Sequence, residues 1–270
     1  KPASITSFLT EAVFAGMIES GILPAGSVQL LCGSAGDLLD HLDEQCAVAL
    51  TGSAATGQLL KQMPALMRNS VRFNCEADSL NFSMLGPDAV PGTEEFDLFI
   101  KEVANEMTTK AGQKCTAIRR TIVPEAMLED GQRALARRLG GTVIGDPAVE
   151  GVRMGPLAGR AQVGEVRKAA AAIASDAELV FGAPDTVQVT GADATKGAFF
   201  PILLFASSDP FHRTAPHDIE AFGPVNTLMP YRSVDEAIAL AKRGRGSLVG
   251  SVFTGDDAVA RTVALGTAAH

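Results

Sequence analysis

The sequence predicts an α/β protein in which helices cover a parallel sheet. Apolar runs of strand length alternate along the chain with amphipathic runs of helical length, and glycines stand at many of the junctions. Hydrophobic residues make up 46% of the 270 residues and charged residues 20%, a balance that suits a globular core. The length allows two modest α/β domains or one large domain.

The first elements form one alternating set. A helix is expected over residues 4–20, because its apolar residues share a face and Gly21 follows as a stop. A strand-like run at residues 27–32 leads through Gly33 into a short helix over residues 38–42.

A second strand, a glycine turn and a helix come next. We expect strands at residues 47–50 and 71–75, with the turn at residues 51–57 opening the helix between them. After Glu76 the alternation restarts, so we place a domain boundary there and divide the chain into residues 1–78 and 79–270.

The second domain begins with the clearest helix signal. Thr93 is a suitable N-cap, and Glu94 and Glu95 fall in the first turn, where carboxylates are favourable. The other strands are expected at residues 80–85, 118–123, 179–181, 199–205 and 248–253 and in a run ending at 231, and the other helices at residues 126–139, 160–173 and 233–242.

Charge and cysteine usage exclude several classes of protein. The formal charge of −8 argues against a nucleic-acid or anionic-membrane partner, and the local pairs Arg119–Arg120 and Arg137–Arg138 are interpreted as solvated faces. The four cysteines lack a CxxC or a secreted-scaffold spacing, so we expect a cytoplasmic protein. No apolar run has membrane-spanning length and no signal peptide opens the chain. A first residue other than methionine and an end just after a helical pattern indicate a fragment.

One cysteine stands in an unusual setting. A cysteine placed for packing normally lies in an apolar run. Cys115 instead follows the turn at Gly112 and lies between Lys114 and Thr116, a setting that favours thiolate and access. A reactive thiol and an ordinary loop cysteine both stay open on this local evidence.

Other candidate residues each allow two interpretations. The Gly52–Gly57 turn is either a phosphate site at a helix N-terminus or an ordinary turn. Glu76, if partly buried, is either a general base or a paired structural glutamate. Glu220 and Phe222 can grip a ribose and a flat ring, or belong to the core. The four histidines have no metal-ligand spacing and are interpreted as structural or surface residues, so no metal site is expected.

Taken together, the motifs resemble a known family. In order and approximate spacing the chain resembles the aldehyde dehydrogenase superfamily over essentially its whole length. Three longer stretches, at residues 32–42, 76–81 and 107–120, are similar to the dehydrogenase domain of the PaaZ family of bifunctional phenylacetate-degradation proteins. The motifs are Lys1-Pro2-Ala3, Leu50-Thr51-Gly52-Ser53 with Gly57, Glu76, Gly112-Gln113-Lys114-Cys115 and Glu220-Ala221-Phe222-Gly223-Pro224-Val225.

The resemblance implies a fold and a reaction. Residues 1–78 would be part of a Rossmann-type dinucleotide-binding domain, and residues 79–270 a C-terminally incomplete catalytic domain. Cys115 would attack an aldehyde and carry the resulting thioester, and its backbone N–H would contribute to the oxyanion site. Glu76 would activate the hydrolytic water and help to deprotonate the thiol. The family's other oxyanion donor, an asparagine, has no counterpart in this chain.

The resemblance also implies a nicotinamide cofactor. Many NAD-preferring members carry glutamate where Ser4 stands. Serine at this position removes the negative charge, and Lys1 adds a positive one, so a 2′-phosphate could bind there. We therefore expect NADP, with NAD possible. The implied cofactor-binding residues are Lys1 at the adenosine ribose, Ser53 at the pyrophosphate, Glu220 at the nicotinamide ribose, Phe222 at the nicotinamide, and Ser4, Gly33 and Gly52 as further positions.

The implied substrate is a CoA-linked semialdehyde, 3-oxo-5,6-dehydrosuberyl-CoA semialdehyde. The implied partners are a fused MaoC-like hydratase domain and further copies of the chain in a homo-oligomer. Full activity is not expected from the fragment itself. Three alternatives stay open: an aldehyde dehydrogenase for another substrate class, a cysteine-dependent acyltransferase or acyl hydrolase without nicotinamide, and a non-catalytic nucleotide-binding or assembly module.

Overall fold

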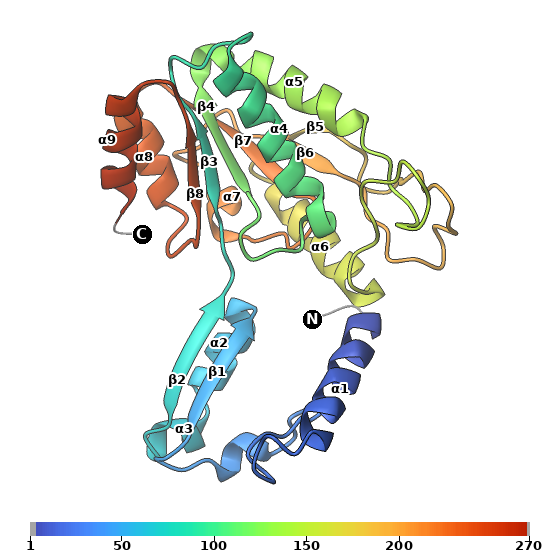
Figure 1. Ribbon diagram of the computed structural model, residues 1–270. Coiled ribbons are helices and arrows are strands. Elements are labelled where there is room, and N and C mark those ends of the chain that lie inside the picture. Colours follow the sequence, from blue (N-terminus) through green and yellow to red (C-terminus); the bar gives the residue numbers. More distant parts are fainter. Residues whose placement is uncertain (1–3, 269–270) are drawn as a thin grey trace. The chain divides into compact units, whose positions relative to one another are not determined.

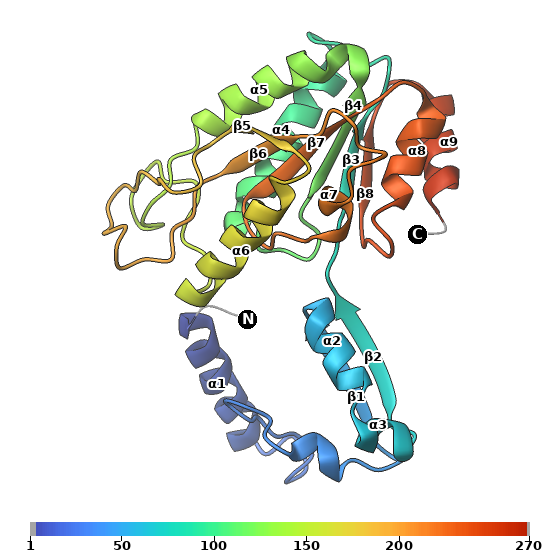
Figure 2. The same cartoon turned by 180° about the vertical axis from the view of Figure 1, so that it is seen from behind.

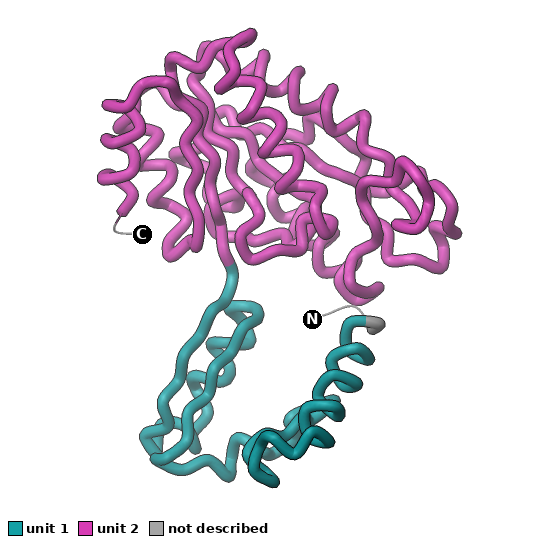
Figure 3. Tube along the Cα trace, in the orientation of Figure 1, with its two compact units in different colours: residues 1–78 teal, residues 79–270 magenta. Residues whose placement is uncertain are grey.

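The computed structural model describes residues 4–268, with side chains from residue 6 onward. The chain forms two compact units, residues 1–78 and residues 79–270 (Figure 3). Strands and helices alternate in both units, and most strands pair in parallel, so the predicted α/β class is confirmed.

The first unit is built around a pair of parallel strands (Figure 1). Strand β1 (Ala47–Gly52) pairs with β2 (Arg72–Ala77), so that Thr51 lies opposite Glu76. Both strands were predicted from the sequence. The other elements of this unit are α1 (Ser4–Glu19), the 3₁₀ turn η1 (Leu38–His41), α2 (Ala54–Lys61) and α3 (Pro64–Arg68).

One predicted strand is wrong. Residues 27–32 form no strand, and Leu31 is 66% exposed. The run has the composition of a strand, but a strand is stable only when a neighbour satisfies its backbone groups, and in the described chain β1 and β2 pair only with each other. Helix α1 likewise exposes apolar side chains, namely Phe8, Leu9, Val13, Met17 and Ile18.

The second unit contains a six-stranded sheet in the order β5-β6-β7-β4-β3-β8. Every pairing in it is parallel except β5 with β6, which is antiparallel and departs from the all-parallel expectation. The strands are β3 (Phe82–Leu85), β4 (Arg120–Pro124), β5 (Glu178–Phe181), β6 (Leu203–Ala206), β7 (Val225–Tyr231) and β8 (Gly250–Phe253).

Helices cover both faces of this sheet (Figures 1 and 2). Consecutive strand residues point to opposite faces. Val123 therefore packs with α4 and α5, whereas Ile122 packs with α8 and α9. The helices and turns are α4 (Glu94–Thr108), η2 (Thr109–Gly112), η3 (Glu125–Met127), α5 (Leu128–Gly140), α6 (Arg160–Ile173), α7 (Ala215–Asp218), α8 (Val234–Lys242) and α9 (Asp257–Thr267).

Local sequence signals set several of these boundaries. Thr93 caps α4 as predicted, because its hydroxyl accepts a hydrogen bond from the Phe96 N–H at 3.3 Å. The helix predicted over residues 160–173 is α6. None of the helices within residues 4–268 combines the length and apolar character needed to cross a membrane.

Candidate active site

The Cys115 turn connects α4 to β4 and has an unusual backbone. Lys110, Ala111 and Gly112 all adopt the left-handed conformation, with φ values of 53°, 52° and 69°. Glycine accepts this region readily, whereas other L-residues pay about 1–2 kcal/mol each. Cys115 follows with its side chain exposed, as its sequence setting predicted. The surroundings must therefore hold this turn in place.

Arg119 is the group that reaches both this turn and a distant one. Its Nη2 donates to the Gly112 carbonyl at 2.8 Å and to the Lys114 carbonyl at 3.3 Å. Its Nη1 donates to the Gly223 carbonyl at 2.8 Å, and its Nε donates to Glu220 Oε1 at 3.3 Å.

The solvated face predicted for Arg119 is therefore wrong, since its side chain is 3% exposed. Burial lowers the pKa of the guanidinium, and the Glu220 carboxylate opposes that shift. Five fixed N–H donors let arginine satisfy several carbonyls at once, which explains its place in the interior.

Arg120 was also predicted to be solvated, and that is also wrong. It is fully buried and donates to the carbonyls of Leu80, Leu240 and Ala241. Burial lowers its pKa to about 9. His217 lies 3.2 Å from its Nη1, and burial together with this cation lowers the His217 pKa to about 4. His217 is therefore neutral at pH 7.

Asn81 fixes the other side of the Cys115 turn. Its Nδ2 donates to the carbonyls of Cys115 at 2.8 Å and Ala117 at 3.0 Å. Its Oδ1 accepts from the N–H groups of Leu248 and Val249. Sequence reasoning missed this role, although Asn81 ends the stretch that begins at Glu76.

The turn that contains Glu220 and Phe222 lies against the Cys115 turn. A Cβ added to Gly112 would come within 2.3 Å of the Gly223 carbonyl oxygen, so the two backbones are in direct contact. Gln113 Nε2 donates to the Phe222 carbonyl at 3.2 Å. The Phe222 ring, 36% exposed, has the Arg119 guanidinium 5.5 Å from its centroid. The structure thus brings Cys115, Glu220 and Phe222 into one region.

The first unit carries the predicted phosphate turn. Gly52 and Ser53 are exposed at the junction of β1 and α2, and Ser53 Oγ accepts from the Thr56 N–H at 3.2 Å. An exposed strand-to-helix turn fits a phosphate group, and beside Gly52 only the Leu50 side chain lies within 4 Å of where a Cβ would stand. Asp78 already accepts from the Ala54 N–H at 3.1 Å, so a bound phosphate would have to share this helix end with a carboxylate.

Three other candidates also belong to the first unit. Gly33 is exposed in a loop with φ of 118°, and a Cβ there would meet nothing within 4 Å. Ser4 opens α1, but its side chain lies outside the described residues, and Lys1 lies outside them altogether. Glu76 is exposed on β2, so the expected partial burial is wrong; β2 pairs with one strand and has mostly exposed side chains.

Lys114, the neighbour of Cys115 in the sequence, forms an ion pair with α4. Its Nζ lies 2.7 Å from Glu106 Oε1. Among the described residues, no hydrogen bond engages the Cys115 N–H, whereas the carbonyls of residues 112, 114, 115 and 117 all accept from Arg119 or Asn81. The backbone donor of the turn is therefore available to a ligand.

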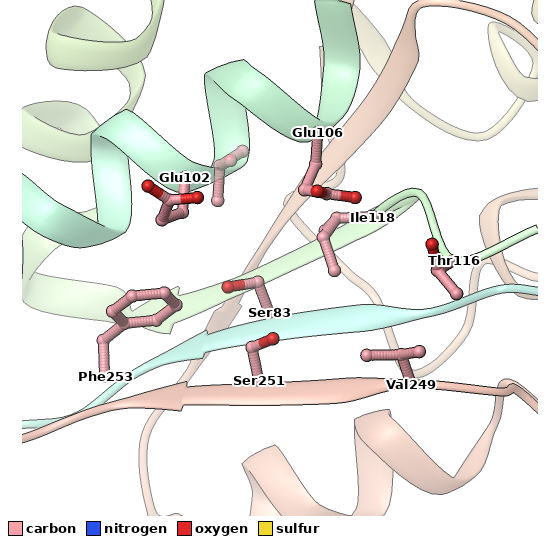
Figure 4. A pocket seen from close by; sticks show the side chains of 9 residues that line it. Ser83, Glu102, Glu106, Thr116, Ile118, Val249, Ser251 and Phe253 are labelled. Atoms are coloured by element: carbon pink, nitrogen blue, oxygen red, sulfur yellow. The ribbon is translucent and has the colours of Figure 1, made fainter. Parts of the chain in front are cut away.

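A pocket of about 250 Å³ lies next to the turn within the second unit (Figure 4). Glu102 and Glu106 on α4 stand above it, opposite hydroxyl and apolar side chains from the sheet. Ser83 Oγ is buried in its floor without a hydrogen-bond partner among the described residues. Thr116, the neighbour of Cys115, lines one end. The remaining lining residues are Val103, Ile118, Val249, Ser251 and Phe253.

The chain is similar to known proteins over almost its whole length. The chain is 45% identical over 259 residues to 3,4-dehydroadipyl-CoA semialdehyde dehydrogenase from Aromatoleum evansii, an alignment that covers 96% of this chain and 50% of that protein. A stretch of 72 residues, 27% of this chain and 22% of the relative, is 51% identical to Protein MaoC from Klebsiella aerogenes.

The fold matches betaine aldehyde dehydrogenase from Staphylococcus aureus, solved in complex with NAD+, with a TM-score of 0.83 and 26% identity over 98% of this chain and 51% of that one. The chain thus spans about half the length of the full-length relatives it matches. The aldehyde dehydrogenase family profile matches residues 1–269. With a profile match of this extent, and with the fold and motif order in agreement, the chain belongs to the aldehyde dehydrogenase family.

Proposed function

We propose that the protein oxidises an aldehyde to a carboxylic acid with a nicotinamide cofactor. The observation that carries this proposal is the exposed Cys115 on a turn in which the carbonyls of residues 112, 114, 115 and 117 accept from Arg119 or Asn81. That arrangement leaves the Cys115 N–H beside its own sulfur as a preorganised donor, which is what an oxyanion needs.

The chemistry follows from these groups. The Cys115 thiolate adds to the aldehyde carbon and forms a thiohemiacetal, whose oxyanion the Cys115 N–H stabilises. A bound nicotinamide cofactor supplies the hydride acceptor. Loss of hydride leaves a thioester on Cys115. Glu76, an exposed carboxylate, takes a proton from the water that attacks this thioester, and the acid product and free thiol result.

The two units would have different roles, cofactor binding and catalysis. The first, residues 1–78, would be part of the dinucleotide-binding domain, with Gly52 and Ser53 at the pyrophosphate and Lys1, Ser4 and Gly33 as further contacts. The second, residues 79–270, would be the catalytic domain. Glu220 would hold the nicotinamide ribose and Phe222 would line the ring. Arg119 donates to the Glu220 carboxylate and to the Gly112 carbonyl. It therefore holds Glu220 near the Cys115 turn, which supports the assignment of Glu220.

We further propose NADP as the preferred form. Ser4 carries no charge to repel a 2′-phosphate and Lys1 adds a positive one. Steady-state kinetics of the full-length protein should give a higher kcat/KM with NADP+ than with NAD+. A higher value with NAD+ would refute the charge argument and leave the aldehyde chemistry intact.

The proposed substrate class is a CoA-linked semialdehyde. The relative from Aromatoleum evansii carries that class in its name at 45% identity. The similarity to Protein MaoC supports the proposal of a fused MaoC-like hydratase domain in the full-length protein. Assembly as a homo-oligomer stays a prediction. A CoA-thioester semialdehyde should be oxidised with a higher kcat/KM than a free aldehyde of the same chain length.

A cysteine hydrolase without nicotinamide is less well supported. It would need a histidine beside the thiol. Among the described residues, His217 is bonded to Arg120 and the Pro210 carbonyl, and His41 and His212 pair with nearby aspartates. No histidine contact to Cys115 is present in that part of the chain.

Substitution of the nucleophile tests the proposal. In the full-length protein, Cys115→Ser should lower the rate of reduced-nicotinamide formation by on the order of 10³-fold or more. The exposed Cys32 offers a matched control, and Cys32→Ser should keep the wild-type rate. Retained turnover in Cys115→Ser, or acid formation without nicotinamide reduction, would refute the proposed reaction.

A further inference from the structure

We propose that Arg119 is a positioning residue that holds the Cys115 turn and the turn of residues 220–223 at one fixed spacing. This inference rests on the function proposed above, in which the thiol and the Glu220 carboxylate serve the same reaction. Arg119 is the buried side chain that donates to both turns, and Gln113, which donates to the Phe222 carbonyl, makes a more exposed second link between them.

The contacts of Arg119 divide between the two turns. Gly112 and Lys114 accept from Nη2 on the thiol side, and Gly223 and Glu220 accept from Nη1 and Nε on the other side. The acceptors on the two sides are separated by about a hundred positions in the chain, so nothing local fixes their spacing. A rigid planar fork that bonds to both turns does fix it.

Two features make the thiol turn dependent on this residue. Its three consecutive left-handed residues persist only under outside constraint. In addition, the Gly112 carbonyl has Arg119 as its only hydrogen-bond donor among the described residues. A buried carbonyl without a donor is costly, so loss of the guanidinium favours movement of the turn. Movement of Gly112 would displace Cys115 three residues later.

Arg120 supplies an internal comparison for this role. It follows Arg119 in the chain and is also buried, but its acceptors are the carbonyls of Leu80, Leu240 and Ala241 and the ring of His217. None of these belongs to either turn. If Arg119 is purely structural, its substitution should affect only stability, as expected for Arg120. If Arg119 positions the thiol, its substitution should also change the reactivity of Cys115.

The experiment compares Arg119→Lys with Arg120→Lys in the full-length protein. Each lysine keeps the charge but loses the planar fork of donors that reaches several acceptors at once. We would measure kcat and KM for the cofactor, the thermal unfolding midpoint, and the alkylation rate of Cys115 by iodoacetamide. Peptide-resolved mass spectrometry gives that rate, with the exposed Cys32 as an internal reference.

Arg119→Lys should lower kcat by about 100-fold, the size expected when reacting groups move by about 1 Å. The alkylation rate of Cys115 should change by about tenfold while that of Cys32 stays constant. Arg120→Lys should lower the unfolding midpoint and leave both Cys115 readouts near their wild-type values. Parallel behaviour of the two variants, with only stability affected, would overturn the proposal.

The test also works if Arg119→Lys does not fold or if the wild-type protein is inactive. If Arg119→Lys does not fold, Glu220→Ala removes one of the two acceptors on the far side of the bridge and leaves the Gly223 carbonyl in place. The Cys115 alkylation rate should still change in that variant, and an unchanged rate would overturn the coupling between Glu220 and the thiol turn. If the wild-type protein oxidises no aldehyde, the alkylation rates still decide whether Arg119 positions the thiol. Failure of the proposed function and failure of this inference are therefore distinguishable.

Discussion

Two glycine turns were predicted as functional from the sequence, and the structure builds them differently. The Gly52–Ser53 turn of the first unit is exposed, and its hydrogen bonds come from its own helix and from Asp78. The Gly112–Cys115 turn of the second unit is left-handed, lies against the backbone of Gly223 and is held by buried Arg119 and Asn81.

The difference predicts how each turn responds to mutation. A change at the exposed turn should remove one contact and leave its neighbours in place, because little else is packed on it. A change at the buried turn should spread to the thiol and to the 220–223 turn, because the same side chains hold both. The three tests below set the two units against each other.

The largest contrast is expected for a matched pair of glycine substitutions. Gly112→Ala places a Cβ 2.3 Å from the Gly223 carbonyl oxygen at a positive φ. It should lower the free energy of unfolding by about 3 kcal/mol, from left-handed strain and overpacking together. Gly52→Ala meets only the Leu50 side chain, at 3.6 Å, and should change that free energy by less than about 0.5 kcal/mol. Denaturant titration of the full-length protein measures both, and equal losses would remove the distinction between the turns.

Next in size is a pH dependence expected from the second unit. Burial and the Arg120 charge lower the His217 pKa to about 4, so between pH 6.5 and 4 the unfolded chain binds the proton that the folded chain refuses. The free energy of unfolding should therefore fall by about 3 kcal/mol as the pH drops from 6.5 to 4. Above pH 6.5 the contribution of His217 should not change with pH.

His217→Gln should flatten this slope in unfolding titrations at several pH values. The control lies in the first unit, where the His41 side chain is 71% exposed. His41→Gln should leave the slope as in the wild type. A slope that survives His217→Gln would show that other groups cause it.

The smallest contrast concerns two helix caps. Ser53 Oγ caps α2 and Ser233 Oγ caps α8, each accepting an N–H three residues on at 3.2 Å. Alanine at either position should cost about 1 kcal/mol of stability. Only Ser53→Ala should also weaken binding of the nicotinamide cofactor, measured by titration. Equal cofactor affinity in both variants would confine Ser53 to a capping role.

Much of the fold could be predicted because its signals are local. The strand and helix alternation, the cap at Thr93 and helix α6 follow from periodicity and from short-range side-chain chemistry. The strand expected at residues 27–32 failed for the opposite reason. Strand formation depends on a pairing partner, and no local pattern states whether one is present.

The candidate site shows the same division. The residue types and order around Cys115, Glu220 and Phe222 were enough to place the chain in its family and to single out the thiol. The pair Arg119–Arg120 looked like a solvated face, because two adjacent charges usually are one. The structure buries both, since carbonyls from distant turns and helix ends supply the acceptors.

The sequence by itself determined the class of fold and the family and singled out Cys115 as the candidate nucleophile, because those depend on residue order and local periodicity. Only the tertiary structure decided which groups hold that thiol in place. Arg119 and Asn81 satisfy carbonyls that the chain brings together from far-separated positions, and a buried polar group must find its partner wherever the fold provides one.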